Sequence, residues 1–199
     1  MPKKGELHVP QHGSRREEIV RAALSVLQRD GYAALTARKI AAEAGMSLGH
    51  ISYHFINMDE VMSEAYRLAA RLLQDTESRL DPGQGTARDR LTVLLNAGFT
   101  DEILNPAYLR MRIDLWSAAL AHPEIARTER ELYQAYRDRL EGLLTEMSHY
   151  SRRDRVPAVC DVLMATLDGL WLDWIRRRDR TSVVRGLELC QKLALLELL

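Results

Sequence analysis

The chain has 199 residues, with 28 Lys and Arg, 28 Asp and Glu, and two cysteines. A formal net charge of zero gives no sign of a nucleic-acid or membrane-surface partner, and two cysteines do not make a disulfide framework. The longest apolar-rich run, Leu193 to Leu199, is too short to span a bilayer, and the first residues lack the apolar core of a signal peptide. We therefore expect a cytoplasmic protein without a membrane partner.

Hydrophobic periodicity of 3.6 residues runs through nearly the whole chain, and alternating β-branched runs are missing. These patterns predict an all-α protein of about nine helices. Residues 1–13, with two prolines and two glycines, are expected to form a flexible arm. Ser14, with Glu17 in capping-box spacing, is expected to start the first helix, which Gly31 ends.

Residues 36–55, TARKIAAEAGMSLGHISYHF, have the spacing of a helix-turn-helix. Ala41 is small where a second helix crosses close to the first, and Gly45 can take the positive φ of a sharp turn. Ile51 supplies an apolar contact between the helices. Thr36 is expected to cap the second helix, and the Ser47 hydroxyl to cap the third by accepting from a backbone N–H. Such a third helix lies in the DNA major groove, so residues 14–57 are expected to form a DNA-binding domain.

The rest of the chain, residues 58–199, is expected to form a larger helical domain. Asn57 is expected to cap a long fourth helix, and DPGQGT, residues 81–86, is the clearest break in the chain. Prolines after Asn105 and His122 mark two further helix starts. The later helices are predicted at about 86–99, 106–121, 123–148, 156–177 and 181–198.

This organisation resembles the TetR family of transcriptional regulators. The matching residues are Gly31, Thr36, Ile40, Ala41, Ala44, Gly45, Ser47, Gly49, Ile51, Phe55 and Asp59. Two later blocks, LWSAALAHPEIARTERELYQAYRDRLEGLL and LDGLWLDW, look like the branch that includes choline-responsive repressors. The resemblance implies a homodimeric repressor that binds a palindromic operator in double-stranded DNA and is released by a small-molecule effector, the larger domain serving effector binding and dimerisation. One departure is Met58, where the family commonly has a lysine that reaches a phosphate.

Candidate DNA contacts come from the second and third expected helices. Hydroxyl, amide and basic groups at such positions can bind phosphates or base edges, and a glycine allows close approach of the DNA backbone. The DNA-binding candidates are Thr36, Arg38, Lys39, Ser47, Leu48, Gly49, His50, Ser52, Tyr53 and His54. Lys3, Lys4, Arg15 and Arg16 form either a DNA-binding arm or a solvated basic tail. His50 and His54 have the i, i+4 spacing of a zinc helix, but no HEXXH motif or further ligand accompanies them, so we expect no metal site.

Candidate effector contacts are aromatic and acidic residues of the later helices. Asp114 and Asp168 each interrupt an apolar stripe, and a carboxylate among aromatic rings suits a cationic ligand. The alternative is that the tryptophans are core residues and the aspartates bond to nearby backbone or to arginines. The effector candidates are Phe99, Tyr108, Asp114, Trp116, Tyr136 and Trp171.

The last two helices carry wide apolar faces that are candidates for a dimer interface. One face comprises Val159, Leu163, Leu167, Leu170 and Trp174, and the other Val184, Leu187, Cys190, Leu193 and Ala194. Alternatively, these faces bury each other within one chain. No Ser/His/Asp grouping, phosphate loop or carboxylate pair indicates catalysis or a cofactor. The rival to a DNA-binding regulator is a helical ligand-binding or adaptor protein with a vestigial helix-turn-helix, which Met58 favours.

Overall fold

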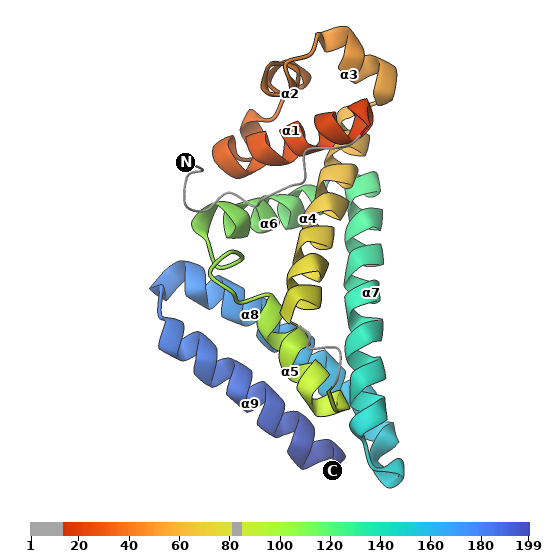
Figure 1. Ribbon diagram of the computed structural model, residues 1–199, viewed down its shortest axis with the longest axis vertical. Coiled ribbons are helices and arrows are strands. Elements are labelled where there is room, and N and C mark those ends of the chain that lie inside the picture. Colours follow the sequence, from red (N-terminus) through yellow and green to blue (C-terminus); the bar gives the residue numbers. More distant parts are fainter. Residues whose placement is uncertain (1–13, 81–84) are drawn as a thin grey trace. The chain divides into compact units, whose positions relative to one another are not determined.

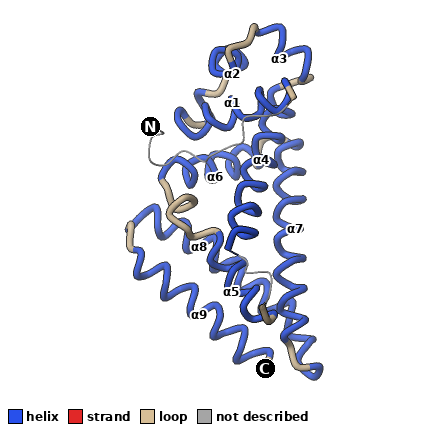
Figure 2. The backbone as a smooth tube through the Cα atoms, viewed as in Figure 1, coloured by secondary structure: helices blue, strands red, loops and turns tan. Residues whose placement is uncertain are grey.

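The computed structural model describes residues 14–80 and 85–199, and every regular element in these two ranges is a helix (Figures 1 and 2). This confirms the predicted all-α fold; the expected arm, residues 1–13, lies outside the described residues. Within the described ranges, no helix combines the length and the apolar character needed to cross a membrane. The α-helices are α1 (Arg15–Asp30), α2 (Ala37–Ala44), α3 (Leu48–His54), α4 (Met58–Leu80), α5 (Ala87–Ala97), α6 (Pro106–Ala119), α7 (Pro123–Met147), α8 (Val156–Arg177) and α9 (Arg180–Leu198), with short 3-10 helices η1 (Tyr32–Ala34) and η2 (Tyr150–Arg155).

The chain divides into two compact units. The N-terminal unit comprises Met1–Leu72 and Asn105–Leu132, and the C-terminal unit comprises Leu73–Leu104 and Tyr133–Leu199. Helices α4 and α7 each contribute their first part to the N-terminal unit and the remainder to the C-terminal unit. The N-terminal unit therefore contains α6 in addition to the helix-turn-helix.

Polar caps fix several helix starts where the sequence predicts them. The Ser14 hydroxyl accepts from the backbone N–H of Glu17 at 3.4 Å, and Asn57 Oδ1 accepts from that of Glu60 at 2.8 Å. Each cap satisfies an N–H that has no partner within its helix, which is worth about 1 kcal/mol. A reciprocal capping box between Thr86 and Asp89 starts α5.

The core of the N-terminal unit is built on α1, which packs against α2 and α6. The apolar stripe of α1 is buried because its members recur every three or four residues and so share one face. Its most deeply buried members are Ile19, Ala23, Val26 and Leu27. Ile40, Ile51 and Phe55 complete this core and hold α2 and α3 to the unit.

The core of the C-terminal unit includes the hairpin of α8 and α9, which pack against each other. Val159, Leu163 and Leu167 of α8 are buried, as are Leu187, Cys190 and Ala194 of α9. For these six residues, the burial agrees with the alternative that the two faces are covered within one chain. Both cysteines are buried free thiols.

Different side chains of this hairpin are exposed. On α8, Ala158, Val162, Ala165 and Gly169 are exposed at successive spacings of four, three and four residues. On α9, Leu189 and Leu196 are 63% and 75% exposed, and Leu199, directly after the helix, is 60% exposed. The hairpin therefore has a second apolar side, which the C-terminal unit leaves uncovered.

Candidate DNA-binding surface

The turn between α2 and α3 is closed by backbone hydrogen bonds around a left-handed glycine. Gly45 has φ 64° and ψ 31°, a conformation that is costly for residues with a Cβ. Its N–H donates to the carbonyl of Ala42 at 3.3 Å, and the N–H of Met46 donates to that of Ala41 at 2.9 Å. This is the Schellman pattern, which satisfies the last carbonyls of α2 and sets the direction in which α3 leaves.

Helix α3 has one buried and one exposed side. Ile51 and the following Phe55 are each only 4% exposed, as their spacing predicts. Tyr53 is 84% exposed and Leu48 50%. The remaining candidates on this helix are exposed at Gly49, His50 and Ser52, and intermediate at His54. The exposed side can therefore meet a groove without rearrangement of the core.

The expected cap by Ser47 is not formed. Ser47 occupies the cap position of α3, but its side chain accepts no backbone hydrogen bond. Its hydroxyl bonds instead to Nδ1 of His50 at 2.8 Å, because the imidazole lies one helical turn further on and competes for the same oxygen. The first N–H groups of α3 are thus left without a side-chain cap, and such N–H groups bind phosphate oxygens in many proteins.

At the start of α2, the candidate residues differ in their partners. Thr36 caps the helix by accepting from the N–H of Lys39 at 3.2 Å. The Lys39 ammonium pairs with Asp30 at 3.1 Å. Arg38 is exposed and, within the part of the chain that the structure describes, forms no ion pair or side-chain hydrogen bond. Arg38 is therefore the cation of α2 that is available to a phosphate.

Of the basic residues expected in an N-terminal arm, Lys3 and Lys4 lie outside the described residues. Arg15 pairs with Glu18 on the same helix. Arg16 pairs with Glu60 at 2.9 Å, and its guanidinium lies 4.6 Å from the centre of the Phe55 ring. Arg16 thus joins α1 to the start of α4 and to the end of α3.

The corner after α1 is held by polar groups that sequence reasoning missed. Gly31, with φ 82°, lets the chain turn, and the N–H of Tyr32 then donates to Asp114 Oδ2 of α6 at 2.9 Å. The Tyr32 hydroxyl lies 2.8 Å from Nε2 of His122, whose Nδ1 lies 3.0 Å from Asp59. Because a carboxylate only accepts, the tautomer of a neutral His122 that fits both contacts donates from Nδ1 to Asp59 and accepts at Nε2 from the tyrosine hydroxyl. Burial first, and then the charge of Asp59, raises the pKa of Tyr32.

The six effector candidates belong to both units. Tyr108, Asp114 and Trp116 lie in the N-terminal unit, where the Arg112 guanidinium covers the Trp116 ring at 5.3 Å. Asp114 bonds to the backbone of Tyr32, in agreement with the alternative of a structural aspartate. The three remaining candidates lie in the C-terminal unit: Phe99, Tyr136 and Trp171.

Of the C-terminal candidates, Phe99 and Trp171 are in contact, and each candidate ring has defined neighbours. The rings of Phe99 and Trp171 lie 5.9 Å apart, and the Trp171 indole N–H donates to the carbonyl of Gly98 at 2.8 Å. The Tyr136 hydroxyl donates to the carbonyl of Leu94 at 3.3 Å, and burial, followed by the charge of Glu77, raises its pKa. Asp168 lies close enough to raise the pKa of both Tyr133 and Tyr136, although burial is the larger cause for each.

Among the described residues, no three His, Cys, Asp or Glu side chains are placed to hold a metal ion. The exposed third helix, the glycine turn and the threonine cap of α2 define a helix-turn-helix protein of the class that places a helix in the DNA major groove.

Comparison with known proteins agrees with this class. Residues 19–65 match the family described as "Bacterial regulatory proteins, tetR family", and residues 87–196 match "BetI-type transcriptional repressor, C-terminal". The chain belongs to the TetR family of transcriptional regulators, with a BetI-type C-terminal domain. It is thus a DNA-binding transcriptional regulator, and its relatives form a non-enzymatic family.

Individual relatives cover most of the chain. The BetI transcriptional regulator of Stenotrophomonas maltophilia is 30% identical over 173 residues, which are 86% of this chain and 84% of that protein. A putative transcriptional regulator of Pseudomonas aeruginosa superposes with a TM-score of 0.75 at 29% identity, over 90% of this chain and 88% of the other. A regulator of Saccharomonospora viridis, solved in complex with choline, shares the fold with a TM-score of 0.71 at 20% identity, over 89% and 93% of the two chains.

Proposed function

We propose that this regulator binds a palindromic operator through the exposed side of α3, supported by the first turns of α2 and α3. The single observation that carries this proposal is the exposure of the α3 side chains opposite the buried Ile51 and Phe55. In this proposal, His50, Tyr53 and His54 reach base edges, and Thr36, Arg38 and Ser47 contact phosphates. The base-edge contacts would select the sequence, whereas the phosphate contacts would fix the register.

Footprinting tests this proposal. The protein is used to select a duplex from a random-sequence pool, and the selected duplex is probed with hydroxyl radicals. Two protected half-sites whose centres lie one helical turn apart, about 34–36 Å, or a multiple of it, are expected from two α3 helices. A single protected half-site, or selection of no sequence, would contradict the proposal.

We propose that the homodimer forms through the second apolar side of the α8–α9 hairpin. Ala158, Val162, Ala165 and Gly169 make a narrow stripe of small side chains on α8, which allows close approach of another helix. Leu189 and Leu196 add larger apolar side chains on α9. A second copy of the chain is the occupant favoured here, because a palindromic operator presents its two half-sites to two identical subunits.

We propose a cationic effector held in the C-terminal unit. The support is a carboxylate, Asp168, beside Tyr133 and Tyr136 in the unit that also contains Phe99 and Trp171. A cation gains both from the charge of the aspartate and from the faces of the rings, each ring being worth about 0.5–2 kcal/mol. The choline complex of the Saccharomonospora viridis regulator is consistent with this class of ligand.

Choline chloride serves as the probe for this proposal. It should quench tryptophan fluorescence and weaken operator binding, and Asp168→Asn should abolish both responses. Asp114→Asn is the matched control, since it removes a carboxylate whose partner is the backbone of Tyr32. A choline response that survives Asp168→Asn but not Asp114→Asn would place the cation elsewhere, and no response in any variant would favour an effector of another class.

A further inference from the structure

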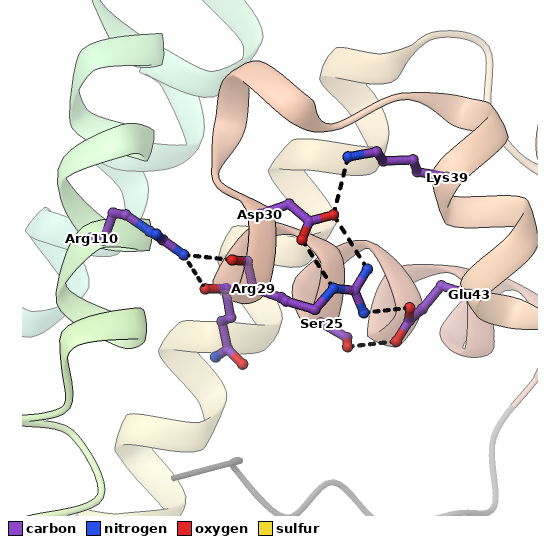
Figure 3. Close-up of polar contacts among 7 residues, drawn as sticks. Ser25, Arg29, Asp30, Lys39, Glu43 and Arg110 are labelled. Carbon is purple, nitrogen blue, oxygen red and sulfur yellow. Dashed lines mark hydrogen bonds and ion pairs between the residues drawn. The ribbon is translucent and has the colours of Figure 1, made fainter.

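The end of α1 is closed by a side chain from α6. Nη2 of Arg110 donates to the carbonyl oxygens of Gln28 at 2.7 Å and of Arg29 at 2.8 Å (Figure 3). The last carbonyls of a helix have no partner inside the helix and carry its negative dipole end, so a guanidinium is well suited to bind them. Because both bonds come from one side chain, the position of α6 fixes the position of this helix end.

The same end of α1 is joined to α2 by a network of charged side chains. The Arg29 guanidinium donates through Nη1 to Glu43 at 2.7 Å and through Nε to Asp30 at 3.0 Å (Figure 3). Glu43 also accepts from the Ser25 hydroxyl at 2.7 Å, and Asp30 accepts from Lys39 at 3.1 Å. Three residues of α1, Ser25, Arg29 and Asp30, therefore hold Lys39 and Glu43 of α2, which lie one turn apart.

The geometry of this network favours a defined arrangement over a loose surface pair. Isolated surface ion pairs contribute little, but networks and bidentate arginine contacts hold their partners in one geometry. Glu43 and Asp30 are both held ionised, since hydrogen bonding to Arg29 lowers the pKa of each carboxyl group. The contacts are thus maintained across the neutral pH range.

We propose that Arg110 is a positioning residue for operator binding, acting on α2 through the end of α1 and the Arg29–Glu43 and Asp30–Lys39 contacts. The inference rests on the proposed reading of DNA by α3. Helix α2 carries Arg38, and its glycine turn directs α3, so a shift of α2 moves both DNA-contacting helices. A displacement of α6 would therefore change the position of α2, and with it that of α3. In this way α6 controls operator affinity without contacting DNA.

Arg110→Met tests the inference, because it keeps most of the stem and removes both hydrogen bonds. With the duplex selected by the wild-type protein, operator binding should weaken by about threefold to tenfold, which lies within the range expected of residues that couple distant sites. The slope of log Kd against log salt should stay unchanged, because no phosphate contact is lost. Arg130→Met, which removes another exposed arginine of the same unit, should leave binding unchanged.

A double-mutant cycle with Glu43→Gln separates positioning from a merely structural role. Figure 3 shows no hydrogen bond or ion pair between Arg110 and Glu43, yet loss of either side chain loosens the same α1–α2 connection. The double variant should therefore bind only as weakly as the weaker single variant. The inference would be overturned if the losses of binding free energy in the two single variants add in the double variant. It would also be overturned if Arg110→Met lowers the salt slope by about one, or binds with wild-type affinity.

Two further measurements separate failure of this inference from misfolding of Arg110→Met and from failure of the proposed DNA-contacting side of α3. If Arg110→Met is unfolded by circular dichroism, Glu43→Gln alone must weaken binding at an unchanged salt slope, and wild-type affinity in that variant overturns the inference. The operator affinity of Tyr53→Ala is measured in parallel. If Tyr53→Ala binds as wild type, the proposed DNA contacts of α3 are wrong. If Tyr53→Ala binds more weakly and Arg110→Met binds as wild type, only the positioning role of Arg110 is rejected.

Discussion

The α2–α3 region and the α8–α9 hairpin are both pairs of packed helices, yet they are specified in different ways. In α2–α3, one glycine turn, one threonine cap and the buried apolar residues Ile40, Ala41, Ile51 and Phe55 leave a single side exposed. In α8–α9, apolar residues occur on two sides of each helix, and only one of those sides is buried within the chain. Local stereochemistry fixes the first pair, whereas the second depends on which partner surface is present.

This difference follows from the kinds of residues involved. A left-handed glycine and a cap residue each act within a few residues along the chain, so their effect can be read without knowing the tertiary structure. A leucine on a helix face is equally stable against a neighbouring helix or against a second subunit, because burial of apolar area is not directional.

The largest effect is expected in the α8–α9 hairpin, where two neighbouring leucines should behave differently. Leu187→Arg places an unpaired charge at a site only 4% exposed, and it should unfold the chain, since such charges cost several kcal/mol, about 3–5. Leu189→Arg, at a site 63% exposed, should leave a folded monomer. Circular dichroism and light scattering measure both outcomes. Leu120→Arg, at another exposed leucine, is the control, and a Leu189→Arg protein that remains a dimer would exclude this side of the hairpin.

A second contrast uses two glycines. Gly45→Ala forces a Cβ into a left-handed conformation and should destabilise the chain by about 1–2 kcal/mol, although the space there is open. Gly142 lies within α7, also with open space around it, and Gly142→Ala should stabilise the chain by about 0.5–1 kcal/mol. Denaturant titration gives both values. Equal effects of the two substitutions would show that the turn at Gly45 does not require a glycine.

The two basic residues of α2 should differ in the salt dependence of operator binding. Arg38→Gln should lower the slope of log Kd against log salt by about 0.9, the value for one lost phosphate contact. Lys39→Gln should change the slope less, because its ammonium already pairs with Asp30. Fluorescence anisotropy at several salt concentrations measures the slopes. Equal decreases in both variants would mean that Lys39 leaves Asp30 and binds DNA.

The smallest effect concerns the buried thiol of α8. Burial raises the pKa of Cys160 to about 11 from an ordinary value of 9.0. The unfolded chain therefore loses this proton first, so the contribution of the thiol to stability is complete below pH 9 and is lost as pH rises towards 11. Urea unfolding at several pH values should show a shallower alkaline decline for Cys160→Ala than for wild type. An identical decline in both would remove the thiol from the pH dependence.

The sequence predicted the fold class, most helix boundaries and the DNA-binding motif, because those features depend on local signals such as Thr36, Gly45 and Asn57. It led us to choose Asp114 over Asp168 as the effector-binding carboxylate, although both interrupt apolar stripes, because only the fold brings Asp114 to the N–H of Tyr32. It missed Arg110 for the same reason: its partners are backbone carbonyls at the end of another helix, 81 and 82 positions earlier. Backbone acceptors carry no sequence signal, whereas a cap or a left-handed glycine does.

The reading of DNA by the exposed side of α3 is tested most directly by two tyrosines of equal exposure. Tyr53 of α3 is 84% exposed, and Tyr150 of η2 is 82% exposed. Truncation of either to alanine removes similar surface without disturbing a core, and operator affinity is measured for both by fluorescence anisotropy. We expect Tyr53→Ala to weaken binding by about 1–3 kcal/mol, as for one good base-edge contact, and Tyr150→Ala to bind as wild type. Equal affinity of Tyr53→Ala and wild type for the operator would contradict the account.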